Sequence, residues 1–542
     1  MKKYLKIHPN DNLIVALQDL QAGEQIVMND EVFSLVSDVK AKHKFALNTT
    51  NIGEELRMYG ILVGKATQNI EQGEVITRQN VTHQTTPVVE RNPQTSWTKP
   101  DISRWQNATF EGYVRKDGSV GTANYWIVFP LVFCENRNID IIRDALADAL
   151  GQNKNQKYRN FAKQKLQESL QNSSENAAET IEIDEPFPFA NVDGVKCITH
   201  AMGCGGTRQD AQALCGLMAG YLTNPNVAGA TVLSLGCQNA QFEILQAEIE
   251  ARDKSFSKPL YYFDQQTLGS EENLIKKAIE ATLKGMTEAN QLQRTTVPIS
   301  NLVVGLECGG SDGFSGISAN PTLGYVVDVI TELGGAAVLA EFPELCGVEQ
   351  ELSNRCVSDT LSDKFLDLMH KYEASAIKVG SGFDMNPSPG NIKDGLITDA
   401  MKSAGAAKKG GNSPIVDILD YPEKVTKMGL NLLCTPGNDV ESTTAVVASG
   451  TNLVLFTTGL GTPTGNPVVP VIKVASNTIL ANKMHDIIDF NTGTIIDGTE
   501  TIKEAGDRML ELILEIASGK TKAKATIHNQ DDFIPWKRGV SL

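Results

Sequence analysis

The chain has 542 residues, a formal net charge of −16 and a pI near 5.0. This length exceeds what one compact core usually holds, so we expect several domains. The negative charge disfavours contact with phosphate backbones, and no apolar run reaches the roughly 18–20 residues that cross a bilayer, so we expect no nucleic-acid or membrane partner. The start lacks a secretory signal pattern, and nine widely spaced cysteines predict free thiols in a reducing cytoplasm.

Residues 1–87 predict a small all-β domain, because short apolar stretches alternate with glycine-containing turns. The phrases DLQAGEQIV (19–27) and NIEQGEVIT (69–77) resemble each other, which indicates a weak internal repeat. Residues 88–109 contain prolines and polar residues without a steady period, so we expect a surface linker there.

Residues 110–296 predict a middle α/β domain. Its beginning has a hairpin-turn signal at 116–118 between two β-like runs, and residues 139–182 look helical and polar. From about 190 to 495, short Val/Ile/Leu runs alternate with helix-like segments, which is typical of parallel sheets buried on both faces. A polar joint at 287–298 separates a larger C-terminal domain, residues 297–542. The sequence therefore predicts an α/β multidomain protein.

Ligands of open α/β sheets bind beyond the carboxyl ends of the strands, so the residues that follow each apolar run are the candidates for chemistry. Glycine-rich polar loops follow several of these runs. The loops contain Cys204, Cys237, Glu307, Cys308, Ser311, Asp312, Asn438 and Asp439.

Cys204, Cys237 and Cys308 each lie beside a glycine at a predicted strand end. Three thiolates are suitable ligands for iron, either as a single ion or as an iron–sulfur cluster with one iron left open. The alternative is that these are small residues filling tight turns. The other cysteines are expected to be packing residues (Cys197, Cys215, Cys346 and Cys356) or are left open (Cys134 and Cys434).

Two histidines lie near these features. His43 stands between Lys42 and Lys44, and nearby cations lower the proton affinity of an imidazole and favour a neutral base. His200 precedes the Cys204 loop by a few residues. Either histidine is otherwise a hydrogen-bonded structural residue.

Several long motifs resemble the altronate and galactarate dehydratase family of bacterial sugar-acid catabolism. They are LECGGSDGFSGISANPTLG (306–324), NPSPGN (386–391), LNLLCTPGNDVESTTA (430–445) and LVLFTTGLGTPTG (453–465), together with GYVRKDGSVGTANYWIV, THAMGCGG and SLGCQN upstream. The opening IHPNDNLIVAL and the HKFAL segment are more similar to the altronate branch, whereas the residues after Cys204 depart from its usual pattern.

The resemblance implies a β-clip (SAF-type) domain, a linker, a middle domain that forms a homodimer interface, and a Rossmann-like C-terminal domain with a mainly parallel sheet. It also implies an iron-dependent hydro-lyase whose partner is a small sugar acid. D-altronate would give 2-dehydro-3-deoxy-D-gluconate. The alternatives are a galactarate dehydratase, a sulfolactate-type lyase, or a sugar-acid sensor without turnover.

Such an elimination removes the proton at C2 and expels the hydroxyl at C3, which needs a base, an acid and a cation. We expect His43 and His200 to transfer protons, and Lys44, Ser311 and Asn438 to bind the substrate. Two ligand sets for Fe²⁺ stay open: the thiolates of Cys204, Cys237 and Cys308, or the carboxylates of Glu307, Asp312 and Asp439, which would also accept Mn²⁺.

Overall fold

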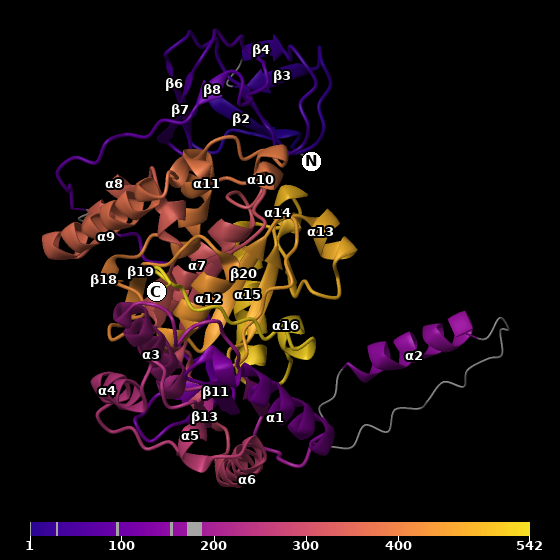
Figure 1. Ribbon diagram of the computed structural model, residues 1–542. Coiled ribbons are helices and arrows are strands. Elements are labelled where there is room, and N and C mark those ends of the chain that lie inside the picture. The colour runs from indigo at the N-terminus through magenta and orange to yellow at the C-terminus, as the bar shows by residue number, and fades with distance from the viewer. Residues whose placement is uncertain (1, 29–30, 94–96, 152–154, 171–186, 542) are drawn as a thin grey trace.

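The computed structural model describes residues 2–28, 31–93, 97–151, 155–170 and 187–541. The N-terminal domain, in indigo, lies against one end of the C-terminal domain, and the middle domain lies at the other end (Figure 1). Within these described ranges, no helix has the length and apolar character needed to cross a membrane.

The N-terminal domain is built from short antiparallel sheets, as predicted. One sheet contains β1 (Tyr4–Leu5), β2 (Leu13–Ala16) and β5 (Lys44–Ala46), a second pairs β3 (Gln25–Met28) with β4 (Glu31–Ser34), and a third contains β6 (Glu55–Met58), β7 (Ile61–Ala66) and β8 (Val81–Thr82). The two similar segments, residues 19–27 and 69–77, have the same turn conformation at their glycines. Gly23 and Gly73 have φ angles of +79° and +83°. Both angles favour glycine.

The segment after this domain runs along the C-terminal domain. Arg91 donates hydrogen bonds to the carbonyl oxygens of Ser353 and Cys356 and pairs with Asp359. Residues 94–96 of the predicted linker lie outside the described residues. The described part of the linker is therefore fastened to the body of the protein at Arg91.

The predicted hairpin at 116–118 is confirmed. β9 (Thr109–Val114) and β10 (Val120–Gly121) pair in antiparallel fashion around a turn in which Gly118 has a φ of +84°. β9 also pairs with β15 (Thr295–Pro298). The two ends of the middle region thus meet in one small sheet.

The middle domain has a parallel sheet. Its strand order is β12 (Gly194–Cys197), β11 (Tyr125–Pro130), β13 (Val227–Ser234) and β14 (Leu260–Asp264). Its helices are α1 (Asn136–Ala149), α2 (Gln156–Leu170), α3 (Arg208–Thr223), α4 (Phe242–Arg252), α5 (Gln265–Leu268) and α6 (Glu271–Ala289). Helix α2 extends away from the body of the molecule (Figure 1). Residues 171–182 of the predicted helical region lie outside the described residues.

The C-terminal domain contains a larger parallel sheet, which confirms the predicted fold class. Its order is β18 (Ile415–Leu419), β19 (Gly429–Leu433), β17 (Ala336–Leu339), β16 (Val303–Cys308), β20 (Leu453–Thr458), β21 (Val471–Ala475) and β22 (Phe490–Asn491). The chain adds strands on one side of β16 and then, from β20 onward, on the other. The switch point between β16 and β20 is where such sheets bind ligands.

Helices cover both faces of this sheet. Successive side chains of a strand point to opposite faces, and here both sets are apolar and need to be covered. Leu453 and Leu455 face a core shared with α7 (Ala319–Glu332) and α15 (Ile502–Ala517), while Val454 and Phe456 face the opposite side. The remaining helices are α8 (Glu349–Arg355), α9 (Asp359–Lys378), α10 (Pro389–Lys393), α11 (Asp399–Ala406), α12 (Asp439–Ala448), α13 (Thr478–Lys483), α14 (Gly493–Ile496) and α16 (Lys524–Ile527).

The two large sheets share one core through α3 and α12. These helices begin at the carboxyl edges of the middle and C-terminal sheets, respectively, and end side by side, with Gly220 against the backbone of Ala448. The C-terminal segment contacts both helices, because the Ile534 N–H donates to Thr444 Oγ1 and the Arg538 N–H donates to Asp210 Oδ1. The carboxyl edges of both sheets therefore open toward the same side.

Candidate active site

The loop after β16, residues 309–313, lies at the switch point of the large sheet. The Gly309 N–H donates to Thr457 O at 3.0 Å, and Gly310 O accepts hydrogen bonds from the N–H groups of Gly459 and Leu460. Gly310 has a φ of +60°, which favours glycine. We call residues 309–313 the switch loop, and the end of β20 holds it in place.

Asp312, at the far end of the switch loop, is fully buried. Its carboxylate accepts hydrogen bonds from Ser315 Oγ at 2.9 Å, Ser476 Oγ at 2.8 Å and Asn477 Nδ2 at 3.1 Å. It also pairs with the Lys42 ammonium at 3.0 Å. Asp312 thus fixes a negative charge at the carboxyl edge of the sheet, opposite the N-terminal domain.

The N-terminal domain contributes Lys42 and Lys44 to this edge. Lys42 bridges Asp312 and Asp394, and Lys44 Nζ donates to Gly395 O at 2.6 Å and to Lys42 O at 3.0 Å. A Cβ on Gly313 or Gly395 would lie 2.4 or 2.3 Å from Lys42 O. Only glycine at both positions allows this close approach of the two domains.

The Lys44 amine has an unusual environment. Burial lowers its pKa to about 7, although the Asp312 carboxylate acts in the opposite direction. His43 Nε2 lies 3.1 Å from Lys393 O, and burial lowers the pKa of its half-buried imidazole. Of the two neighbouring bases, Lys44 is the one whose pKa is affected by the Asp312 carboxylate.

A second group of charged residues surrounds the end of β16. Cys308 Sγ lies 3.0 Å from Glu344 Oε2, Lys402 pairs with Glu344 at 2.6 Å, and Lys409 pairs with Glu341 at 2.7 Å. We call the whole group the lysine–carboxylate centre. It comprises Glu307, Cys308, Glu341, Glu344, Lys402, Lys409 and Asp439.

The centre contains more carboxyl groups than lysines. Burial and the Glu341 charge raise the pKa of Glu307, and burial together with Glu344 raises the pKa of Asp439 to about 6. Glu307 Oε2 and Glu341 Oε1 are buried and lack a hydrogen-bond partner among the described residues. Glu341 also adopts a left-handed φ of +66°, which is strained for this residue type. Unsatisfied oxygens and strain are typical of a functional site.

The middle domain presents three exposed cysteines at the carboxyl edge of its sheet, namely Cys134, Cys204 and Cys237. Their loops are joined by hydrogen bonds, because the Phe133 N–H donates to Met202 O and the Asn239 N–H donates to Gly203 O. Burial raises the pKa of the Cys134 thiol, and the other two thiols add to this effect. We call residues 131–136, 200–206 and 236–240 the thiol loops.

His200 holds one of the thiol loops. Its Nε2 lies 2.8 Å from Pro130 O, and its Nδ1 accepts a hydrogen bond from the Met202 N–H at 3.1 Å. Burial lowers the pKa of the imidazole to about 4. Because both ring nitrogens bind the backbone, the proton-transfer role predicted for His200 has no free nitrogen to perform it, and the ring instead positions the loop.

Neither predicted ligand set is gathered at one place. Cys308 lies in the lysine–carboxylate centre rather than with Cys204 and Cys237, whose third neighbour is Cys134. Glu307 and Asp439 share the centre, but Asp312 pairs with Lys42 instead. The predicted sets are divided because the apolar runs belong to two separate sheets, each with its own carboxyl edge.

The two predicted polar binding residues have structural hydrogen bonds. Ser311 is buried, and its carbonyl oxygen accepts a hydrogen bond from Asn391 Nδ2 at 2.7 Å. Asn438 is exposed at the start of α12, where its Oδ1 caps the N–H groups of Val440 and Glu441. Both residues border the site through the loops they hold.

Four residues of the centre were not among those predicted from the sequence. Glu341 and Glu344 follow β17, so the strand-end rule would have found them if it had been applied to that run. Lys402 and Lys409 come from α11 and the short turn after it, and their sequence gives no local signal. Their role depends on the tertiary packing of this segment against β17.

Three family models together match most of the chain. The altronate/galactarate dehydratase SAF domain matches residues 2–84, the second domain of D-galactarate dehydratase/altronate hydrolase matches residues 112–290, and the C-terminal domain of D-galactarate/altronate dehydratase matches residues 299–541. The last two ranges contain the thiol loops and the lysine–carboxylate centre, respectively.

Individual relatives align over nearly the full length. The altronate dehydratase of Bacillus subtilis (strain 168) is 32% identical, and that of Escherichia coli (strain K12) is 31% identical, with 100% of both chains covered in each case. The galactarate dehydratase (L-threo-forming) of Escherichia coli is 32% identical, with 97% of this chain and 95% of the relative covered. The chain therefore belongs to the altronate/galactarate dehydratase family of hydro-lyases.

Proposed function

We propose that this enzyme dehydrates a hexonate, with D-altronate as the substrate and 2-dehydro-3-deoxy-D-gluconate as the product. The observation that carries the proposal is the buried Lys44 amine, which has a pKa of about 7 and lies beside Gly313 of the switch loop, next to the Lys42–Asp312 ion pair. An amine of this kind is partly neutral near pH 7 and is able to accept a proton from a weak carbon acid.

The charges at the site suit a sugar acid. Hydroxyl groups of the substrate would donate to the unsatisfied oxygens of Glu307 and Glu341, and its carboxylate would be attracted to Lys42 and Lys402. Lys44 and Asp312 are fully buried, so substrate reaches them only when the side chains that cover the switch loop rearrange.

The residues suggest a division of labour along the switch loop. Lys44 lies at the Gly313 end and takes the C2 proton, while Asp439 lies beside Gly309 at the other end. Asp439 holds a proton more readily than an ordinary carboxyl group because its pKa is raised to about 6, so it donates that proton to the departing C3 hydroxyl. Water leaves, and the resulting enol becomes the 2-keto acid.

We propose that iron binds at the thiol loops through Cys134, Cys204 and Cys237. At least two of these three sulfurs lie more than 4.8 Å apart. The ligands of a single tetrahedral ion with bonds of about 2.3 Å stand only about 3.8 Å apart. The wider spacing fits an iron–sulfur cluster better than one ion. Bound iron would supply a Lewis acid at the thiol loops.

Replacing Cys134 tests this ligand set. We expect Cys134→Ser to lose most of the iron and acid-labile sulfide that the wild-type chain incorporates on anaerobic reconstitution, because one of three thiolates is gone. Cys308→Ser should keep both, since Cys308 lies in the other domain. The measurement is iron and sulfide per chain with electron paramagnetic resonance spectra. Equal iron and sulfide in Cys134→Ser and the wild type would exclude Cys134 as a ligand.

The substrate is tested by an anaerobic activity screen with added Fe²⁺, Mn²⁺ or chelator. We expect release of a 2-keto acid from D-altronate, and little or none from galactarate or sulfolactate. Turnover of galactarate alone would reassign the enzyme to the other branch of the family. Tight binding of altronate without turnover in the iron-loaded protein would instead support a sugar-acid sensor.

We also propose a cytoplasmic location and a homodimer. All nine cysteines are free, as is usual in a reducing compartment. The dimer rests on the family resemblance of the middle domain.

A further inference from the structure

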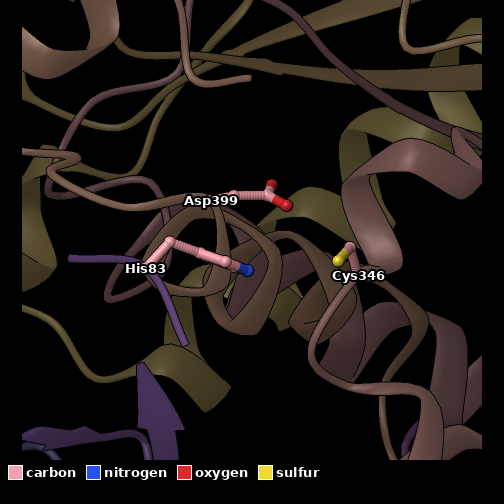
Figure 2. A group of neighbouring side chains, drawn as sticks. All are labelled: His83, Cys346 and Asp399. Atoms are coloured by element: carbon pink, nitrogen blue, oxygen red, sulfur yellow. The ribbon is translucent and has the colours of Figure 1, made fainter. Parts of the chain in front are cut away.

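His83, Cys346 and Asp399 form a cluster of metal-ligating side chains away from the thiol loops. One ligand atom from each residue lies within 4.8 Å of the other two. Figure 2 shows the His83 ring and the Cys346 sulfur pointing toward each other from opposite sides, with the Asp399 carboxylate beside the space between them. The sequence predicts a packing role for Cys346, whereas the structure places its sulfur in this cluster.

The cluster lies where the N-terminal domain meets the C-terminal domain. His83 directly follows β8, whereas Asp399 begins α11. Thr398 Oγ1 donates to Val63 O at 2.7 Å, and a Cβ on Gly347 would lie 2.7 Å from the Thr85 side chain. Gly347 has a φ of +93°, so glycine is favoured both by the backbone and by this close approach.

Two of the potential ligand atoms are not satisfied by the protein. Asp399 is 2% exposed, and its Oδ2 has no hydrogen-bond partner among the described residues. His83 Nδ1 is likewise buried and unpartnered there. Buried polar atoms without partners are costly, and in native proteins they usually indicate an absent ligand, ion or water.

We propose that His83, Cys346 and Asp399 bind a borderline divalent cation of the Zn²⁺ or Fe²⁺ class, which fastens the N-terminal domain to the C-terminal domain. A set of one nitrogen, one sulfur and one oxygen suits these ions, whereas Mg²⁺ and Ca²⁺ prefer oxygen ligands alone. The three ligand atoms now lie at most 4.8 Å from one another. Bonds of about 2.0–2.3 Å to one ion would bring them about 1 Å closer together. Three protein ligands leave one tetrahedral position for water.

Zinc and cobalt titrations of the chelator-treated full-length chain test the site. We expect wild-type protein to bind one more Zn²⁺ per chain than Cys346→Ser or His83→Gln. Co²⁺ should produce a thiolate-to-cobalt charge-transfer absorption that decreases in Cys346→Ser. Zn²⁺ should also raise the midpoint of thermal unfolding of the wild type by several degrees, because a ligand that binds only the folded state stabilises it.

Cys197→Ser is the matched control, since Cys197 is also half-buried but lies in the middle domain. It should behave as wild type in all three measurements. Asp399→Asn, which keeps the size of the side chain, provides a third ligand variant, and circular dichroism before titration shows that each variant is folded. Equal zinc stoichiometry and equal cobalt spectra in the wild type and the ligand variants would overturn the proposal. Because this site needs no sulfide, acid-labile sulfide distinguishes it from iron at the thiol loops.

Discussion

Replacing Lys44 with methionine is expected to lower kcat by about 10²–10⁴-fold, which is the usual contribution of a general base. Lys44 is the fully buried amine beside the switch loop, and methionine preserves its length and packing without offering a proton acceptor. Lys44→Arg should lower kcat to a similar extent, because a guanidinium stays protonated at any working pH and cannot accept a proton. Steady-state rates of keto-acid formation measure both variants.

The pH dependence gives a sharper test. The pKa of Lys44 is lowered to about 7, so the amine is protonated below this value and neutral above it. The reactive form needs a neutral Lys44 and a protonated Asp439, whose pKa is raised to about 6, so wild-type kcat should be highest between pH 6 and 7. The residual rate of Lys44→Met should lose the rise on the acid side of this maximum and keep the fall on the alkaline side. Lys40→Met, at an exposed site of the same domain, should keep the wild-type rate and profile. An unchanged profile in Lys44→Met would assign the base to another residue.

Replacing Lys409 with methionine is expected to destabilise the C-terminal domain by about 3–5 kcal/mol, because removal of one partner leaves a buried charge uncompensated. The Lys409 ammonium is 1% exposed and lies 2.7 Å from Glu341. The shift of the urea transition of this domain at pH 7 measures the loss. The loss should shrink as the pH falls, because burial raises the pKa of Glu341 and the carboxyl group then accepts a proton.

The neighbouring lysine offers a matched control. Lys408 is 33% exposed and lies 3.8 Å from Glu351, so Lys408→Met should cost about 1 kcal/mol or less. The double variant Lys409→Met with Glu341→Gln should recover part of the loss, since both charges are then removed. If Lys408→Met and Lys409→Met unfold at the same urea concentration, the buried pair does not hold the centre together.

The architecture could be predicted because its signals are local. The runs that became β16, β17, β19, β20 and β21 are short, apolar and nearly continuous, as parallel strands buried on both faces require. The strand-end rule also predicts that Asp312 lies at the carboxyl edge of the sheet, where the structure places it. Both signals depend only on residues that are neighbours along the chain.

The partners across the site could not be predicted in the same way. Cys308 and Cys204 follow similar apolar runs, but their strands belong to different sheets, and periodicity does not say which strands share a sheet. Lys402 and Lys409 face the site only because α11 and the turn after it pack beside β17. The lowered pKa of Lys44 is caused by its burial, and the segment that covers the amine, around Gly395, lies far along the chain.

The contact of Lys44 with Gly395 has a consequence for the synthesis of the protein. The N-terminal domain leaves the ribosome long before Gly395 is translated, and until then its lysines remain in water with the basicity of ordinary surface amines. The amine becomes a neutral-pH base only when the last domain folds against it. A half-made chain would therefore carry the proposed base without its lowered pKa.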